Sequence, residues 1–254
     1  MKFCILLTST IRPNITVFSK RNDPRVRERD YRDVVYALAK TDYPIVFCDS
    51  SDYPLDNIKG VLDARAPETY EVLQFDGSTF PAALGKGYGE LQIIKYALEH
   101  SKILKGCDFI VKITGRYSVQ NLEQILDSMK VDGSTLVVAD YAPLARYTYS
   151  GFFIARPIFF TKYLFPLQDF LNDSEKRFFE IALHQAIQKA EQEGSAVLPF
   201  PVKPLISGYS GTWNVKMAEG NYKDIKMSLP KMRIIISAYW KALQNRLRRL
   251  FHEA

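Results

Sequence analysis

The chain has 254 residues, of which 47% are hydrophobic and 24% are charged, and this composition is typical of a globular protein rather than a disordered one. The net charge of +6 is uneven. Residues 231–254 hold six basic residues and one acidic residue, a balance of +5, which leaves +1 for residues 1–230. This distribution disfavours a nucleic-acid partner, which would require basic residues spread over a binding face.

Two further features of the composition bear on the cellular setting. The first apolar run, residues 3–7, is too short for a signal-peptide core or a membrane span, so we expect a cytoplasmic protein. The three cysteines, Cys4, Cys48 and Cys107, are far apart and odd in number. That pattern favours small buried apolar side chains over a disulfide framework or a metal site.

Strand and helix patterns alternate in the first part of the chain. We expect strands at residues 2–8, 44–48, 70–75, 109–113 and 135–139, and helices at residues 26–40, 90–104 and 119–129. Such β-α-β alternation predicts an α/β fold whose mainly parallel sheet is flanked by helices.

The pattern changes after Tyr141. We expect a strand at residues 151–155 and a long helix at residues 174–193, with Ser174 as its N-cap. A Pro- and Gly-rich stretch, residues 198–214, is expected to be a loop, and its length favours a functional role. We therefore expect one domain at residues 1–229, followed by a basic amphipathic C-terminal helix at residues 230–254.

Polar residues follow several of the predicted strands. In open parallel sheets, ligands bind at the carboxyl ends of strands. Polar residues after a single strand are typical of an ordinary loop. The polar residues after several parallel strands, however, are expected to line one edge of the sheet. The candidate substrate-binding residues at these ends are Thr8, Ser9, Thr10, Arg12, Asp49, Lys112, Thr114 and Gly115.

A glycine-rich string, Gly85 to Glu90, opens the third predicted helix. Glycines allow close approach of a ligand, and free amides at the start of a helix favour an anion. The string lacks the Lys-Ser/Thr ending of a phosphate loop and does not follow the first strand, so taken alone it favours a flexible turn over an anion site. Its candidate substrate-binding residues are Lys86, Gly87, Tyr88 and Gly89.

The string GKGYGELQIIKYALEHSKILKGCDFIVKITGRY resembles the central stretch of GT-A glycosyltransferases. The strings KITGRY, TSTIRPN, CDSS and SGTWN are similar to those of small bacterial transferases that make surface polysaccharides, such as capsule and lipopolysaccharide. The resemblance covers roughly residues 3–215. It implies a GT-A-like fold, a nucleotide-sugar donor, with a UDP-sugar expected, a glycan or lipid-linked acceptor, and substrate-binding roles for Ser210, Gly211 and Thr212 in SGTWN.

The chain departs from that family where the Asp-x-Asp signature would stand, because it has Thr114, Gly115 and Arg116 there. The two missing acids normally hold a divalent cation that neutralises the donor diphosphate. Either another acid holds Mn²⁺ or Mg²⁺, or no metal is used and Arg116 supplies fixed positive charge. Lys112 and Lys86 lie nearby in the sequence, although Lys112 alternates with apolar residues and could point away.

An inverting sugar transfer needs a carboxylate that accepts the proton of the acceptor hydroxyl. The two candidates are Glu180, in the helix predicted at residues 174–193, and Asp140, at the end of the strand predicted at residues 135–139. The resemblance favours Glu180, because in that fold the base often lies near the start of a helix in the second half of the sheet. A solvent-facing helix residue is the alternative for Glu180.

Residues 231–254 form an amphipathic pattern. On a helix, Trp240, Leu243, Leu247 and Phe251 fall on one apolar arc, and most of the basic residues fall on the other side. This pattern is typical of helices that bind an anionic membrane surface, which predicts a peripheral protein at the inner face of the cytoplasmic membrane. Packing on the protein's own core is the alternative.

Two other functions fit the same pattern. A catalytically silent sugar- or nucleotide-binding module would explain the lost Asp-x-Asp. A nucleotidyltransferase would share the sheet but would carry a glycine-rich loop directly after the first strand, and residues 8–14 contain no glycine. We therefore expect a glycosyltransferase.

Overall fold

A seven-stranded sheet forms the centre of the computed structural model, which describes residues 1–14, 19–77, 79–212 and 214–217. Its strand order is β3-β2-β1-β4-β7-β6-β8. The strands are β1 (Phe3–Ser9), β2 (Ile45–Asp49), β3 (Tyr70–Gln74), β4 (Phe109–Thr114), β6 (Thr135–Val138), β7 (Phe152–Ala155) and β8 (Ala196–Leu198). All neighbours pair in parallel except β7, which runs antiparallel to β4 and β6. The predicted mainly parallel sheet is confirmed.

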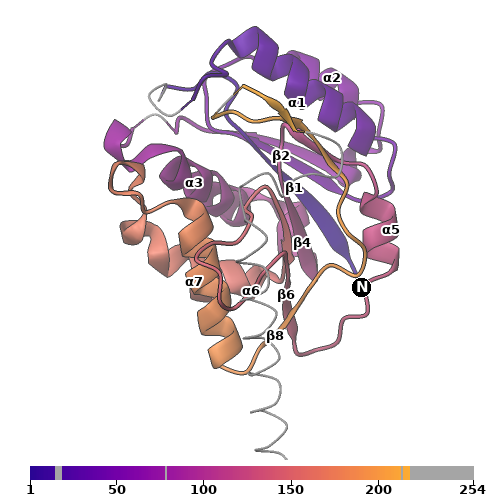
Figure 1. Ribbon diagram of the computed structural model, residues 1–254. Helices are drawn as coiled ribbons and strands as arrows, with labels where there is room; N and C mark the ends of the chain where they lie inside the picture. Colours follow the sequence, from indigo (N-terminus) through magenta and orange to yellow (C-terminus); the bar gives the residue numbers. More distant parts are fainter. Residues whose placement is uncertain (15–18, 78, 213, 218–254) are drawn as a thin grey trace, which may run out of the picture. The chain divides into compact units, whose positions relative to one another are not determined.

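Helices cover both faces of this sheet (Figure 1). The α-helices are α1 (Pro24–Leu38), α2 (Asp56–Leu62), α3 (Gly85–His100), α4 (Lys102–Lys105), α5 (Leu122–Asp127), α6 (Pro157–Phe159) and α7 (Phe179–Gln192). Shorter helical turns span Pro67–Thr69, Ala82–Leu84, Phe160–Leu164, Phe165–Phe170 and Asp173–Glu175. One face packs against α3, α4, α6 and α7, and the other packs against α1, α2 and α5.

The period-two alternation of each strand divides the core into these two layers. In β1, Cys4 and Leu6 belong to the α3–α7 layer, whereas Ile5 and Leu7 belong to the α1–α2 layer. The strands are apolar on both faces because helices cover both faces. By this alternation Lys112 of β4 falls on the α3 side, where it is fully buried.

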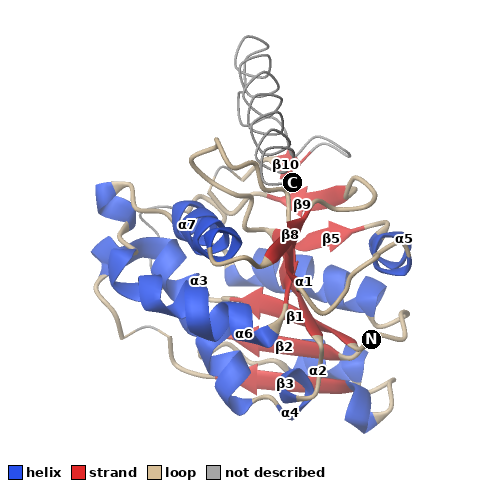
Figure 2. Cartoon of the chain, turned by 90° about the horizontal axis from the view of Figure 1, so that it is seen from below, coloured by secondary structure: helices blue, strands red, loops and turns tan. Residues whose placement is uncertain are grey.

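A second, three-stranded sheet has the order β10-β9-β5 (Figure 2). It is formed by β5 (Tyr117–Val119), β9 (Ile206–Tyr209) and β10 (Lys216–Met217). Both pairings are antiparallel. The prediction of a loop throughout residues 198–214 is therefore wrong, because this stretch contains β9. The pairing of β9 with β5, which is far away in the sequence, explains why no local pattern indicated the strand.

Three other predicted boundaries differ from the structure. The helix expected at residues 174–193 begins only at Phe179, and Ser174 lies in a separate short turn rather than at its N-cap. The helix expected at residues 119–129 is shorter, because residues 117–119 form β5. The third helix already begins at Gly85, so the glycine-rich string forms its first turns.

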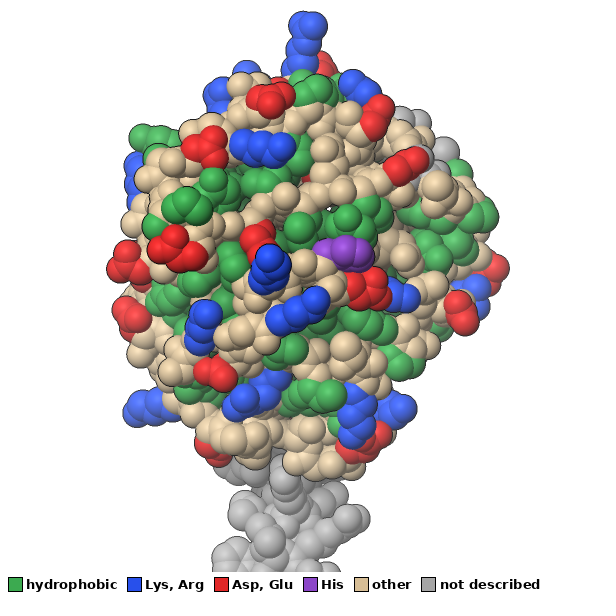
Figure 3. Space-filling view, turned by 180° about the vertical axis from the view of Figure 1, so that it is seen from behind, with side chains coloured by type: hydrophobic (Ala, Val, Ile, Leu, Met, Phe, Trp, Pro, Cys, Tyr) green, Lys and Arg blue, Asp and Glu red, His purple; other side chains and the backbone are tan. Residues whose placement is uncertain are grey.

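Basic and acidic side chains are interspersed on the face seen in Figure 3, in agreement with the nearly neutral balance of residues 1–230. Among the described residues, no helix is both long enough and apolar enough to span a membrane. The amphipathic helix predicted at residues 230–254 lies outside the described residues.

Candidate functional site

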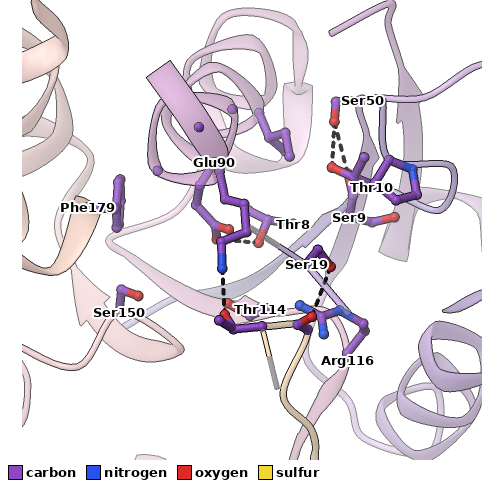
Figure 4. Close-up of a pocket in the computed structure, with 18 of the residues that line it drawn as sticks. Thr8, Ser9, Thr10, Ser19, Ser50, Glu90, Thr114, Arg116, Ser150 and Phe179 are labelled. Atoms are coloured by element: carbon purple, nitrogen blue, oxygen red, sulfur yellow. Dashed lines mark hydrogen bonds between the residues drawn. The ribbon is translucent and has the colours of Figure 1, made fainter. Parts of the chain in front are cut away.

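A cleft of about 520 Å³ lies at the carboxyl ends of β1 and β4, beside the first turns of α3 and α7. Most of the predicted site residues line it. These are Thr8, Ser9, Thr10, Arg12, Lys86, Gly87, Gly89, Thr114, Arg116, Glu180, Gly211 and Thr212. Figure 4 shows Thr10 and Ser50 on one side of this space and Ser150 and Phe179 on the other. Asp49, Tyr88, Lys112, Gly115, Asp140 and Ser210 are not among the lining residues.

Lys112, which is fully buried, and Glu90, whose side chain is 24% exposed, form an ion pair in the floor of the cleft, with 2.5 Å between Nζ and Oε1. The Lys112 ammonium also donates to the Ser150 carbonyl oxygen at 2.8 Å and to Thr114 Oγ1 at 3.1 Å. Thr8 Oγ1 donates to the same Glu90 oxygen at 2.7 Å. The pair therefore ties α3 to the ends of β1 and β4, and the three donors of Lys112 are used within the protein.

The Glu90 carboxyl is charged despite its position. Burial raises its pKa, but attraction by Lys112 and hydrogen bonds from Lys112 and Thr8 outweigh burial, and the pKa is lowered. Glu90 is a lining residue that the sequence analysis missed. Its only signal was its place at the end of the glycine-rich string, which directed attention to the glycines instead.

Asp49 lies beneath the cleft and is 0% exposed. Its carboxylate accepts hydrogen bonds from the backbone amides of Ile11 and Ser51, at 2.9 and 2.8 Å, and from the hydroxyls of Ser9 and Ser51. This carboxylate holds the loops after β1 and β2 in place. The neighbouring Ser50 is the residue that faces the cleft, and its hydroxyl lies 2.7 Å from Thr10 Oγ1.

The N-terminus of α3 holds a carboxylate of the chain itself. Asp173 accepts hydrogen bonds from the backbone amides of Lys86, at 2.8 Å, and Gly87. Gly85 is required there, because its φ is +77° and a side chain would collide with Asp173. Asp173 thus takes the place where an anionic ligand was expected, and burial raises the pKa of this carboxyl although both amides and Lys86 lower it.

Arg116 extends from the end of β4 toward the N-terminal loops. Its Nε donates to the Tyr31 hydroxyl at 3.3 Å, and its Nη1 donates to the Tyr209 carbonyl oxygen at 3.0 Å. Gly115 makes this possible, because a Cβ there would lie 2.9 Å from the Tyr31 ring. The Thr-Gly-Arg sequence at this position is therefore explained by the packing of α1 against the end of β4.

The 209–212 segment contributes Gly211 and Thr212 to the lining of the cleft. The Gly211 carbonyl accepts hydrogen bonds from Ser19 Oγ, Lys20 N and Arg21 N, at 2.9, 3.0 and 3.2 Å. Lys86 Nζ donates to Thr212 Oγ1 at 2.5 Å, so α3 reaches the same segment. These hydrogen bonds join the 209–212 segment to residues 19–21 and to α3, which are far away in the sequence.

Glu180 lies in the first turn of α7 and lines the cleft. Its neighbours Ser150 and Phe179 lie across the cleft from Arg116 in Figure 4. Ser150 Oγ donates to its Oε1 at 2.7 Å, and Phe178 and Phe179 precede it as lining residues. Asp140, the second candidate base, is exposed and lies outside the cleft lining. Of the two carboxylates, the structure brings only Glu180 to the cleft.

We name the two sides of the cleft by their chemistry. The cationic wall consists of Thr10, Arg27, Tyr31 and Arg116, and the carboxylate wall consists of Ser150, Asp173, Phe179 and Glu180. Arg27, Tyr31, Ser150 and Asp173 were not identified from the sequence. All four come from segments whose approach to the cleft depends on tertiary packing.

The acids of the cleft do not fit the divalent cation of the GT-A signature. No cluster of three or more His, Cys, Asp or Glu side chains occurs among the described residues. The three lining acids are each engaged separately, Glu90 by Lys112, Asp173 by the α3 amides, and Glu180 by Ser150. Divalent cations prefer several oxygen ligands around one point, and these acids do not provide it.

Comparison with known proteins gives fold likeness only. No protein-family model matches the chain, and no curated protein matches it. A cytidylyltransferase from Leptospira borgpetersenii serovar Hardjo-bovis is 12% identical, with a TM-score of 0.45 over 80% of this chain and 77% of that chain.

Two glycosyltransferase structures are similar to the same degree. The mannosyltransferase PcManGT from Pyrobaculum calidifontis, in complex with GDP-Man and Mn²⁺, is 11% identical, with a TM-score of 0.46 over 78% of this chain and 54% of that chain. The galactosyltransferase LgtC, in complex with donor and acceptor sugar analogues, is 11% identical, with a TM-score of 0.48 over 77% and 72%. Scores and identities this low do not determine an activity.

Proposed function

We propose that the chain is a glycosyltransferase that binds a nucleotide-sugar donor in the cleft, with a UDP-sugar as the expected donor. The observation that carries the proposal is the pairing of a cationic wall with a carboxylate wall across one cavity. The cationic wall suits the diphosphate of a donor, and the carboxylate wall suits the hydroxyl of an acceptor. A sugar bound between them would have its leaving group and its attacking group on opposite sides.

The proposed reaction is an inverting transfer. The acceptor hydroxyl oxygen attacks the anomeric carbon of the donor sugar while Glu180 accepts the hydroxyl proton. The bond between the anomeric carbon and the phosphate oxygen breaks, and its electron pair leaves with the nucleoside diphosphate. Arg116 stabilises the charge that develops on that leaving group, and the Ser150 hydroxyl keeps the Glu180 carboxylate oriented.

The finer identity of the substrates rests on the sequence resemblance. We propose a glycan or lipid-linked acceptor in the synthesis of a bacterial surface polysaccharide. Residues 231–254, which lie outside the described residues, are proposed to bind anionic lipid at the inner face of the cytoplasmic membrane, with about 1 kcal/mol from each basic residue near the surface. Co-sedimentation of the full chain with anionic vesicles at low and high salt tests this part separately.

Titration calorimetry with a panel of nucleotides tests the donor site. We expect a nucleoside diphosphate, with UDP first, to bind to the full chain and to compete with its sugar ester. Release of the diphosphate from the sugar ester is then measured with glycan acceptors.

Each outcome of this experiment identifies a function. Binding without any turnover supports the silent binding module, and formation of a nucleotide-sugar from a nucleoside triphosphate and a sugar phosphate supports a nucleotidyltransferase. Either result would replace the proposed transferase. Absence of binding to every nucleotide at millimolar concentration would contradict both enzymatic functions and would leave only a sugar-binding module.

A further inference from the structure

Two guanidinium groups meet at one phenol oxygen in the cationic wall. The Tyr31 hydroxyl oxygen accepts hydrogen bonds from Arg116 Nε at 3.3 Å, from Arg27 Nη2 at 3.1 Å and from the Thr10 amide at 3.2 Å. Arg27 is 5% exposed and Tyr31 is 2% exposed. Both arginines line the cleft, so two positive charges lie side by side at its edge.

The hydrogen-bond partners of these arginines among the described residues are all neutral oxygens. Arg27 donates to the carbonyls of Thr10 and Arg21, and Arg116 donates to the carbonyl of Tyr209. Three other cations near the cleft have carboxylate partners, whereas Lys86 donates to the Thr212 hydroxyl. Lys112 pairs with Glu90 at 2.5 Å, Arg21 with Asp30 at 2.5 Å, and Arg12 with Asp52 at 2.9 Å. The positive charge of the cationic wall is thus not balanced by a contacting carboxylate.

The surroundings of the two arginines leave room for an anion. Burial lowers the pKa of Arg27 and so does the neighbouring Arg116, whereas Tyr31 and Asp49 raise it. Burial also lowers the pKa of Arg116, but Tyr31, Tyr117 and Glu90 outweigh burial, and the pKa is raised. Asp49 and Glu90 therefore offset part of the positive charge without contacting the arginines. A bound anion would contact the guanidinium groups directly, because these groups hold phosphate oxygens through parallel hydrogen bonds.

The two arginines have different geometric roles. Arg27 Nε and Nη2 both donate to the Thr10 carbonyl, and its Nη1 donates to the Arg21 carbonyl, so this side chain is fixed from both sides. Arg116 Nη2 makes no hydrogen bond with the described residues. Arg116 is therefore the arginine that can contact a ligand directly, and Arg27 adds its charge behind it.

Tyr31 fixes the orientation of Arg116. Its ring is held by α1 and packs edge-on against Phe47, with 6.0 Å between the ring centroids. The Gly115 amide donates to the Thr8 carbonyl at 2.9 Å, which brings the end of β4 close above this ring. The hydroxyl of a rigid, buried tyrosine thus limits the positions that the Arg116 side chain can take.

We propose that Arg27, Tyr31 and Arg116 form a binding site for a diphosphate group that needs no divalent cation, with Tyr31 as the positioning residue of Arg116. The assignment of this diphosphate to a nucleotide-sugar rests on the proposed function, whereas the anion site itself rests on the geometry of the cationic wall. The fixed charges of Arg27 and Arg116 match the two negative charges that a diphosphate diester carries at neutral pH.

The test is titration calorimetry of the full chain in the presence of a chelator, with inorganic pyrophosphate, UDP and uridine as separate probes. The variants are Arg116→Lys and Tyr31→Phe. Tyr70→Phe is the matched tyrosine control. Tyr70 begins β3 outside the cleft lining, and its hydroxyl also makes a hydrogen bond, as a donor to Asp63. Arg65→Lys is the matched arginine control, because Arg65 also binds backbone carbonyls but does not line the cleft.

We expect pyrophosphate and UDP to bind without metal. Arg116→Lys should weaken both by about 10- to 100-fold, the usual range for a hydrogen bond to a charged group, and Tyr31→Phe by about 3- to 10-fold. The affinity for uridine, which has no phosphate, should stay unchanged in both variants. Neither control should change the affinity for pyrophosphate, although Arg65→Lys is expected to lower the Tm.

Three results would overturn the proposed site. The first is UDP binding that requires Mn²⁺ or Mg²⁺. The second is an equal loss of UDP and uridine affinity in Tyr31→Phe, which would indicate general damage rather than loss of the Arg116 orientation. The third is no effect of Arg116→Lys on pyrophosphate. Pyrophosphate binding that depends on Arg116 while every nucleotide fails to bind would support the site and contradict the proposed transferase function.

Discussion

The two walls of the cleft are built from different parts of the sheet. The cationic wall comes from the all-parallel half, where α1 and the loops after β1 and β4 meet, and its groups are held by backbone carbonyls and a shared tyrosine. The carboxylate wall comes from the half that contains the antiparallel β7, where α7 and the turn before β7 meet. Its acids are each held by one or two donors.

This difference separates two chemical tasks. A group that stabilises negative charge acts best when it is fixed in advance, and the cationic wall is fixed at several points. A base must instead gain a proton during the reaction, and Glu180 has one described side-chain donor and a cleft-facing position. The predictions below change one wall at a time.

The largest expected effect is that of Glu180→Gln. The amide keeps the shape of the side chain but cannot accept the proton of the acceptor, so turnover should fall about 10²-fold or more. Donor affinity should remain close to normal, because the cationic wall is untouched. Measurements of kcat and of donor Kd test both parts. Asp140→Asn is the matched control, because Asp140 lies outside the cleft lining. Normal turnover of Glu180→Gln would contradict the role of Glu180 as the base.

A comparable effect is expected from Arg116→Ala. Loss of one charged donor aimed at the leaving group should raise the barrier by about 2–4 kcal/mol. A chelator should leave most of the wild-type activity, because the lining acids are engaged separately. Steady-state kinetics with and without chelator measure both effects. Complete inactivation by chelator and rescue by Mn²⁺ would show instead that an acid of the cleft holds a metal ion.

The smallest effects concern stability against pH, where two carboxyls of the cleft should act in opposite directions. The pKa of Glu90 is lowered from its ordinary value of 4.5, so the native state binds fewer protons than the unfolded state, and its contribution is lost as the pH falls below about 4.5. The pKa of Asp173 is raised from 3.8, so its linkage has the opposite sign, and stability decreases as the pH rises from 3.8 through the native pKa.

Urea unfolding at intervals of about one pH unit between pH 3 and pH 7 tests this pair. Relative to wild type, Glu90→Gln should flatten the loss of stability on the acid side, and Asp173→Asn should steepen it. If the free energy of unfolding depended on pH in the same way in the two variants, the opposite effects of Glu90 and Asp173 would be contradicted. Glu123→Gln, on the exposed face of α5, is the control for the general effect of removing a carboxylate.

Much of the fold could be predicted, because the buried strands carry their own signal. The apolar runs that became β1, β2 and β4 were located to within two residues, since strands covered on both faces are apolar throughout. β9 was missed because it is a short strand in a Pro- and Gly-rich stretch, and one of its partners, β5, is far away in the sequence. The beginning of α7 was missed because a polar run after Asn172 imitates a helix start.

The candidate site could be predicted in part for the same reason. Strand ends were read correctly as one edge of the sheet, and Thr8, Thr10, Thr114 and Arg116 indeed line one cleft. Side-chain direction could not be read in the same way. Asp49 and Lys112 end up beneath the cleft surface because backbone amides and Glu90, distant in sequence, satisfy their charges. Tyr31 had no signal of its own, because a tyrosine in a helix usually reads as core.

The Gly211 carbonyl has a consequence for the order in which the protein acquires its activity. Its bond to Ser19 joins residues that are 192 positions apart, and Arg21 reaches Asn214 over 193 positions. The last strand of the seven-stranded sheet ends at Leu198, so the segment around residue 211 is synthesised after all seven of these strands. Newly made chains should therefore become competent for ligand only after this segment has been synthesised and has returned to the N-terminal loops.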